Sequence, residues 1–253
     1  MNFFLLVFSR RWWWTSLIVL AAIGVTIRLG IWQLDRNAQR QALIRQVLAV
    51  QAMPVLDLTQ RPLPSNLETF EFRRVTVSGQ YDFNHQVVLR NQVRVLDLGN
   101  ESGFALVTPL LMADGTAIMV ERGWIPLQYD TPSSWRQFDE PGMMRLEGIL
   151  RLSMQKGELG NLLQDPTLTP SQASLNTWNF INLPRLQLQI PYPILSIYIQ
   201  QVPVATQGTL PYRLVEQPDL DPGEHIGFAM QWFFFCALLV VGYPIWLKKQ
   251  NKQ

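Results

Sequence analysis

The chain has 253 residues, a formal net charge of +2 and a hydrophobic content of 48%. All 19 acidic residues lie between Asp35 and Glu224, so apolar ends flank a mildly acidic middle. This distribution excludes the basic surface that nucleic-acid binding requires. The single cysteine, Cys236, excludes a disulfide framework or a multi-cysteine metal site within one chain.

Residues 12–34 form the first apolar run, which opens with three tryptophans after Arg10 and Arg11. About 20 helical residues cross the hydrocarbon core of a bilayer, and tryptophan is typical of its interfaces. The run is too long for a cleaved signal peptide and lacks a small-x-small cleavage site. It therefore predicts a transmembrane helix. Residues 37–51 contain good helix formers, so the helix is expected to continue until Pro54.

From Phe72 onwards the apolar period changes to two, which is typical of strands. Asp114-Gly115 predicts a hairpin because glycine accepts the positive φ of a tight turn. The predicted strands are residues 72–79, 86–91, 103–111, 116–121, 143–152 and 192–201. Residues 156–177 receive no assignment. The pattern predicts an α+β domain dominated by an antiparallel, possibly barrel-like sheet.

Residues 224–247 form the second predicted transmembrane helix, which Lys248 and Lys249 follow. The positive-inside rule places the basic outer ends of both helices in the cytoplasm. The expected order is therefore a cytoplasmic N-terminus (1–11), a span (12–34), an extracytoplasmic domain (35–223), a span (224–247) and a cytoplasmic C-terminus (248–253).

Both spans carry polar residues, which usually face a ligand or another helix. Neutral imidazole is a common ligand of haem iron, and Phe228 and Trp232 share one helical face with His225. His225 could instead cap its helix or anchor it at the headgroups. Arg28 could extend to the headgroups, and in an antiparallel pair it comes to a depth similar to that of Gln231.

The chain is not expected to be an enzyme. It has two histidines, and His85 lies in an apparent strand without a nucleophile elbow nearby. A glycine-rich phosphate loop and a copper-type Cys or Met/His cluster are both missing from the sequence. A membrane-anchored hydrolase would need a nucleophile close to His85.

Several segments together resemble the surfeit locus protein 1 family of cytochrome c oxidase assembly factors. The most specific are Arg122-Gly123-Trp124-Ile125-Pro126 and His225-Ile226-Gly227-Phe228-Ala229-Met230-Gln231-Trp232-Phe233. The others are Leu29-Gly30-Ile31-Trp32-Gln33-Leu34-Asp35-Arg36, Gly79-Gln80-Tyr81-Asp82, Leu89-Arg90, Thr108-Pro109-Leu110 and Glu147-Gly148.

The resemblance implies a plasma-membrane protein that binds haem a transiently and helps to insert it into subunit I of the oxidase, with haem A synthase as a possible further partner. It implies His225 as axial ligand, in a pocket shaped by Trp32, Gln33, Phe228, Gln231 and Trp232. It gives Arg36, Arg122, Gly123 and Trp124 a docking or structural role. The alternative is a membrane chaperone that stabilises subunit I by helix packing without binding haem.

The chain departs from the family pattern at four positions. Phe228 stands where the family has tyrosine, Glu121 where it has asparagine, and Asn182 where an acidic residue is common. Arg28 matches no family position.

Overall fold

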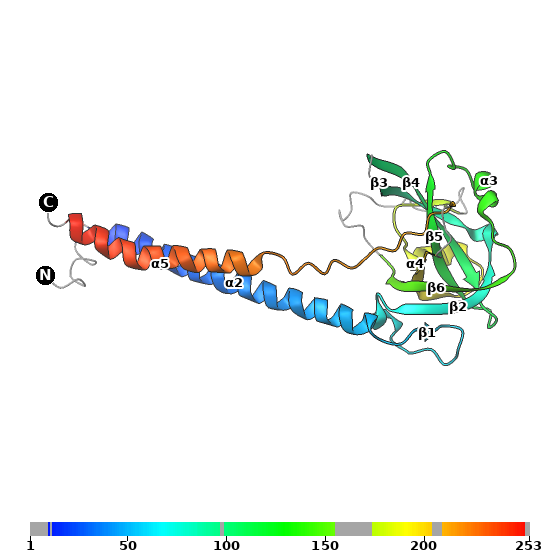
Figure 1. The fold of residues 1–253 in the computed structure, drawn as a ribbon, viewed down its shortest axis with the longest axis horizontal. Helices are drawn as coiled ribbons and strands as arrows, with labels where there is room; N and C mark the ends of the chain where they lie inside the picture. The colour runs from blue at the N-terminus through cyan, green and yellow to red at the C-terminus, as the bar shows by residue number, and fades with distance from the viewer. Residues whose placement is uncertain (1–9, 11, 97–98, 155–173, 204–208, 251–253) are drawn as a thin grey trace. The chain divides into compact units, whose positions relative to one another are not determined.

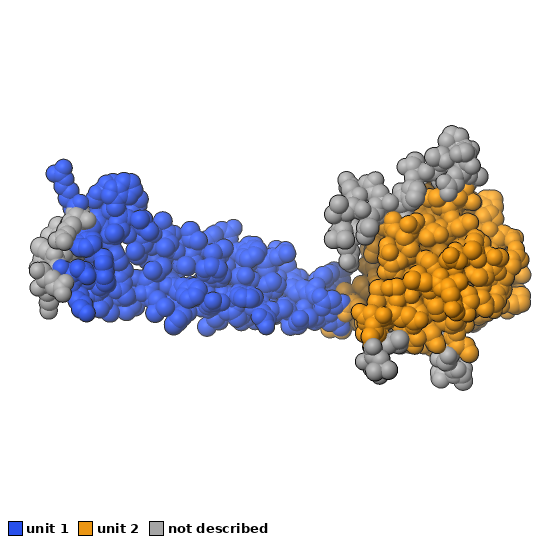
Figure 2. Space-filling model, turned by 90° about the horizontal axis from the view of Figure 1, so that it is seen from above, with its two compact units in different colours: residues 1–46, 219–253 blue, residues 47–218 orange. Residues whose placement is uncertain are grey.

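The computed structural model describes residues 10, 12–96, 99–154, 174–203 and 209–250. Apart from residues 174–177, the unassigned segment 156–177 lies outside this description. The chain divides into two compact units, residues 1–46 with 219–253 and residues 47–218 (Figure 2).

The first unit contains the long apolar helix α5 (His225–Gln250) and most of α2 (Trp13–Gln51), whose residues 47–51 belong to the second unit (Figure 1). Both are long and apolar enough to cross a bilayer. The expected pair of apolar helices flanking a β-rich domain is thus confirmed. As expected, α2 continues as one helix through residues 37–51 and ends before Pro54.

The second unit is built on one sheet of eight strands in the order β1-β2-β6-β8-β5-β4-β3-β7. An additional pairing of β2 with β4 closes five of these strands into a barrel, which confirms the barrel-like prediction. Most pairs of neighbouring strands are antiparallel, whereas β5 pairs with β8 in parallel. The strands are β1 (Leu56–Asp57), β2 (Arg74–Tyr81), β3 (Val87–Leu96), β4 (Gly99–Leu111), β5 (Ala117–Pro126), β6 (Met143–Leu152), β7 (Thr177–Trp178) and β8 (Ile194–Gln201).

The predicted hairpin joins β4 to β5, and Gly115 adopts a φ of +80° in its turn. β3 extends to Leu96, beyond the predicted end at Asn91. Asn91 has a φ of +61° and lies where the register against β4 shifts, which is the geometry of a bulge. The bulge interrupts the alternation, and for this reason the pattern predicted too short a strand.

The sequence did not predict the short helices, whose few residues give no measurable period. They are η1 (Leu67–Phe70), η2 (Phe83–His85), α3 (Pro132–Trp135), η3 (Arg136–Phe138), α4 (Leu183–Leu186) and η5 (Gln187–Gln189). Asn182 caps α4, because its side-chain oxygen accepts a hydrogen bond from the Arg185 amide at 3.2 Å. An acidic side chain could make the same bond, which accounts for this departure from the family pattern.

β5 is buried on both faces. Ile118 and Val120 belong to the apolar cluster of the barrel interior, whereas Met119 packs with Trp178 and Leu183 in a second cluster. Two-sided burial explains why this segment reads as a continuous apolar run rather than as an alternation.

Candidate functional site

The candidate site lies at the seam between α2 and α5, which run side by side in the first unit (Figure 1). At one end of the seam, the Tyr243 hydroxyl lies 2.7 Å from the hydroxyl of Ser16 and 3.1 Å from that of Thr15. Trp12 packs edge-to-face on Trp246 beside this cluster, with ring centroids 5.1 Å apart. Polar contacts of this kind fix the register of helices in an apolar medium.

Gly30 brings the two helices close together near the other end of the seam. A Cβ added at this position would lie 2.7 Å from two ring carbons of Phe233. The Phe233 ring therefore packs directly on the α2 backbone, a small-residue contact typical of membrane helices.

His225 and Gln33 meet one turn beyond this contact. The Nδ1 atom of His225 lies 2.9 Å from Oε1 of Gln33, and both side chains are half-buried. Since an amide oxygen accepts, Nδ1 carries the proton and donates it. In a neutral imidazole with this donor, the lone pair is on Nε2.

Arg40 of α2 binds the segment that leads into α5, at residues 219–221. Its guanidinium donates to the carbonyl oxygens of Asp219 and Asp221 at 2.9 Å each, and it also pairs with the Asp219 carboxylate. Gly223 follows, with a φ of +71°, and a Cβ at that position would lie 3.5 Å from Nε2 of His225. The glycine thus leaves this side of the ring clear of a side chain. No sequence motif marks Arg40, which became recognisable only through its contacts.

In the part of the chain that the structure describes, no hydrogen bond or ring contact joins the other predicted pocket residues to His225. Trp32 and Phe228 are 45% and 46% exposed, and Gln231 is also exposed. Trp232 is half-buried and packs edge-to-face on Phe235. Phe228 and Trp232 follow His225 by three and seven residues, so they border the same side of α5.

The structure does not bring Arg28 and Gln231 together, although they come to a similar depth. Both are exposed. Gly30 and Gln33 face α5, and the helical period turns Arg28 to the opposite side of α2.

The residues around His225 fit an axial ligand of haem iron. A metal-binding histidine almost always donates its other ring N–H to an acceptor, and Gln33 provides that acceptor. Gly223 leaves room beside Nε2, and Phe228 and Trp232 provide apolar rings on the same side of α5.

The Arg-Gly-Trp motif lies in the barrel rather than at this seam. Arg122 is fully buried, and it donates to Gln86 at 3.1 Å and to Glu140 at 2.9 Å. Trp124 is 2% exposed and exchanges backbone hydrogen bonds with Tyr212. The docking or structural role predicted for this motif stays a prediction. Arg36 is exposed on α2 and donates to Gln39.

Glu121 stands beside this motif on the outer face of β5. Burial raises its pKa from 4.5 to about 7; a hydrogen bond from Gln200 and the charge of Arg151 act against the shift, and Glu216 adds to it. Because folding disfavours the ionised form, the wild-type chain loses stability as the pH rises from about 4.5 through 7.

We therefore expect Glu121→Gln to stabilise the chain at pH 8 by about 2 kcal/mol and to have little effect at pH 5. Denaturant unfolding of the full chain in detergent at both pH values measures the difference. Glu147→Gln changes an exposed carboxylate on β6 and is the control. An equal gain at both pH values would contradict the assignment.

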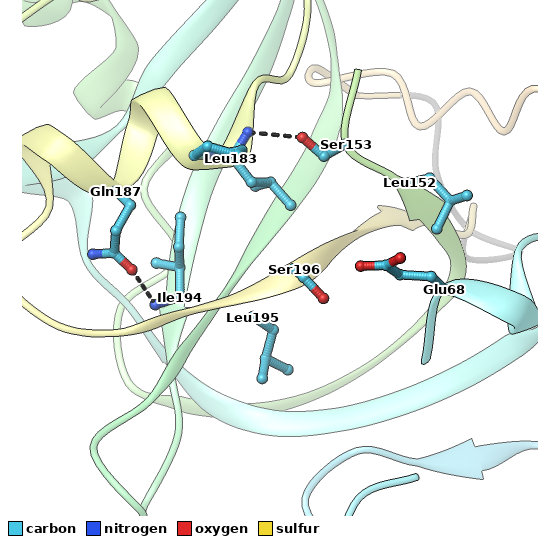
Figure 3. Close-up of a pocket in the computed structure, with 9 residues that line it drawn as sticks. Glu68, Leu152, Ser153, Leu183, Gln187, Ile194, Leu195 and Ser196 are labelled. Carbon is cyan, nitrogen blue, oxygen red and sulfur yellow. Dashed lines mark hydrogen bonds between the residues drawn. The ribbon is translucent and has the colours of Figure 1, made fainter. Parts of the chain in front are cut away.

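The outer domain also has a surface cavity of about 370 Å³ between α4, β6, β8 and η1 (Figure 3). Ser153 accepts the Leu183 amide at 3.0 Å, and Gln187 accepts the Ile194 amide at 2.9 Å. These bonds hold the start of α4 against the residue that follows β6, and η5 (Gln187–Gln189) against β8, so the side chains of Ser153 and Gln187 serve the fold.

The other histidine, His85, contacts the Asp82 carboxylate through Nδ1 at 2.6 Å, and Tyr192 donates to the same carboxylate at 2.7 Å. Within the described ranges, no group of three His, Cys, Asp or Glu side chains could hold a metal ion. His225 is therefore the better-placed histidine for a ligand.

Comparison with known proteins points to one family. A family model described as the SURF1 family matches residues 20–237, a range that includes Gln33 and His225. Surfeit locus protein 1 of Arabidopsis thaliana is 21% identical over 85% of this chain and 72% of its own length. The Xenopus tropicalis protein of that name is 24% identical over 88% and 72%. A SURF1-like protein of Rickettsia felis is 21% identical over 92% and 96%.

Proposed function

The chain belongs to the SURF1 family, and on this basis we propose that it is a cytochrome c oxidase assembly factor that holds haem a transiently between α2 and α5. The observation that carries the proposal is the 2.9 Å contact between His225 and Gln33, which joins the two helices and leaves Nε2 free to bind. His225 would hold haem a through Nε2, and the haem would supply an iron centre that can bind an imidazole nitrogen.

Each residue at the seam has a distinct task. Gln33 fixes the tautomer and the orientation of the His225 ring by accepting a hydrogen bond from Nδ1–H. Arg40 positions the chain that precedes His225, and Gly223 keeps the approach to Nε2 open. Phe228 and Trp232 present apolar surface to the macrocycle. A single histidine ligand suits a carrier, because a guest that must be handed to subunit I has to be released.

We place both termini in the cytoplasm and the barrel outside the bacterial plasma membrane. The basic residues Arg10, Arg11, Lys248 and Lys249 flank the ends of the helices that lie away from the acidic middle. The similarity to a Rickettsia felis protein over nearly the full length of both chains supports a bacterial setting.

The test is the absorbance spectrum of the full chain purified from cells that make haem A. We expect a Soret band in the wild-type protein and its loss in His225→Ala, because the variant lacks the axial nitrogen. Gln33→Leu is expected to weaken haem retention by about 10–100-fold, the usual cost of removing an outer-shell partner.

His85→Ala is the matched control, because it removes the other histidine at a site paired with Asp82. This variant should keep the band. A band that is missing from the wild-type protein, or that persists in His225→Ala, would leave the haem-independent chaperone as the remaining function.

A further inference from the structure

Arg28 lies on the face of α2 that is turned away from α5. The positions of α2 that meet α5 include Ser16, Gly30 and Gln33. At about 100° per residue, Arg28 lies roughly 200° from Gly30 around the helix. Arg28 is exposed, and no atom lies within 4 Å of a Cβ added at Gly24, one turn before it.

The depth of Arg28 places it within the apolar part of the helix pair. Between the Trp12–Trp246 contact and the Gln33–His225 contact, α2 rises about 30 Å, the thickness of a bilayer core. Arg28 lies five residues before Gln33, so its Cα is about 7 Å inside the nearer rim. An arginine that faces hydrocarbon at this depth is unfavourable.

An arginine in this position could reach water if its side chain extended to the headgroups. The direction of α2 hinders this for Arg28. Side chains in a helix lean toward its N-terminus. The N-terminus of α2 is at the farther rim, so the Arg28 side chain leans away from the nearer one. No hydrogen bond or ion pair to Arg28 forms within the part of the chain that the structure describes.

We propose that this outer face of α2 binds a transmembrane helix of a partner protein that carries an aspartate or glutamate at the depth of Arg28. The carboxylate would neutralise the guanidinium and satisfy its fork of donors. Small residues one and two turns before Arg28 allow close approach of a second helix. The face consists of Leu17, Ala21, Gly24, Arg28 and Ile31, all of which are exposed.

Charge decides between the possible occupants of this face. A two-fold axis that joined the face to itself would bring two Arg28 guanidinium groups together, which like-charge repulsion opposes. A lipid phosphate would have to be reached against the lean of the side chain. A carboxylate on a neighbouring helix can lie at the depth of Arg28. It neither repels the guanidinium nor requires the side chain to extend against its lean. The proposal does not depend on haem binding, because His225 lies on the other helix.

The experiment uses the full chain, labelled with a donor dye at its C-terminus and reconstituted in phosphatidylcholine vesicles. The probe is an acceptor-labelled single-span Leu/Ala peptide with one aspartate five residues inside one end. We expect energy transfer to show about tenfold tighter association than for the same peptide with leucine at that position. Arg28→Gln should remove this preference, and Arg28→Lys should retain part of it.

Arg36→Gln is the matched control, because it removes an exposed arginine of α2 that lies beyond the apolar run. Three results would overturn the proposal. One is equal association of the aspartate and leucine peptides, or a preference that survives in Arg28→Gln. Another is loss of the preference when phosphatidylglycerol is added, which would identify a lipid as the occupant. The third is self-association of the chain that depends on Arg28 and excludes the peptide. An unchanged unfolding midpoint of the outer domain shows that each variant is folded.

Discussion

Replacing Arg122 by methionine is expected to lower the free energy of unfolding by about 3 kcal/mol, because it removes a fully buried guanidinium and takes a hydrogen-bond donor from Gln86 and from the Phe138 carbonyl. Arg122 is the largest charged side chain that is fully buried in the described structure. Its guanidinium donates to Gln86, Glu140 and the Phe138 carbonyl, and it lies 4.8 Å from the centroid of the Tyr81 ring.

Unfolding of the outer domain is not expected to be complete in this variant, because Glu140 and Gln86 each keep another contact after Arg122 is removed. Glu140 still pairs with Arg213 at 3.3 Å, and Gln86 still accepts from Thr108 at 2.6 Å. Denaturant unfolding of the full chain in detergent, followed by tryptophan fluorescence, measures the change. Arg136→Met removes an exposed arginine nearby and controls for the substitution itself. A loss below about 1 kcal/mol would show that the buried network contributes little.

The second large effect is expected for Gly123→Ala, which should destabilise the outer domain by about 3 kcal/mol. Gly123 has a φ of +137°, a region that residues with a Cβ rarely adopt. An added Cβ would also lie 2.6 Å from the Tyr212 carbonyl oxygen. That oxygen accepts from the Trp124 amide at 2.7 Å, so the substitution should separate residues 210–213 from β5.

Gly99→Ala is a close control, because Gly99 has a φ of +135° and no atom within 4 Å of an added Cβ. The difference between the two variants therefore isolates the contact with Tyr212 from backbone strain. Near-ultraviolet circular dichroism should report the loss of stacking between Trp124 and Tyr212, whose ring centroids lie 6.2 Å apart. Equal destabilisation by the two alanines, with stacking retained, would contradict this explanation.

These two sites also show how the segment that leaves the barrel is held. Tyr212 pairs with the backbone of Trp124, and Arg213 pairs with Glu140. Further along, Glu216 pairs with Arg151 at 2.9 Å. The Arg-Gly-Trp motif therefore meets this segment directly at Trp124 and, through the shared partner Glu140, at Arg122.

Hydrophobic periodicity in the sequence predicted the two apolar helices, the β4–β5 hairpin and most of the strands. It did not predict α3, α4 or the end of β3, since a single turn has no period and a bulge breaks one. Among the candidate site residues, His225 could be selected because an imidazole beside an apolar run is chemically distinctive. Phe228, Gln231 and Trp232 could be selected by their positions on the second apolar run. Trp32 and Gln33 came from the family resemblance, which gives positions but not contacts.

The sequence by itself determined which residues are apolar, where the two long helices and most of the strands run, and that His225 carries the chemistry of a ligand. Only the tertiary structure decided that Gln33 contacts His225, that Arg40 fastens the preceding segment, and that Arg28 and Gln231 point outward. The physical reason is rotation about the helix axis. A residue's depth follows from counting along the chain, whereas the neighbour it faces depends on how two helices pack.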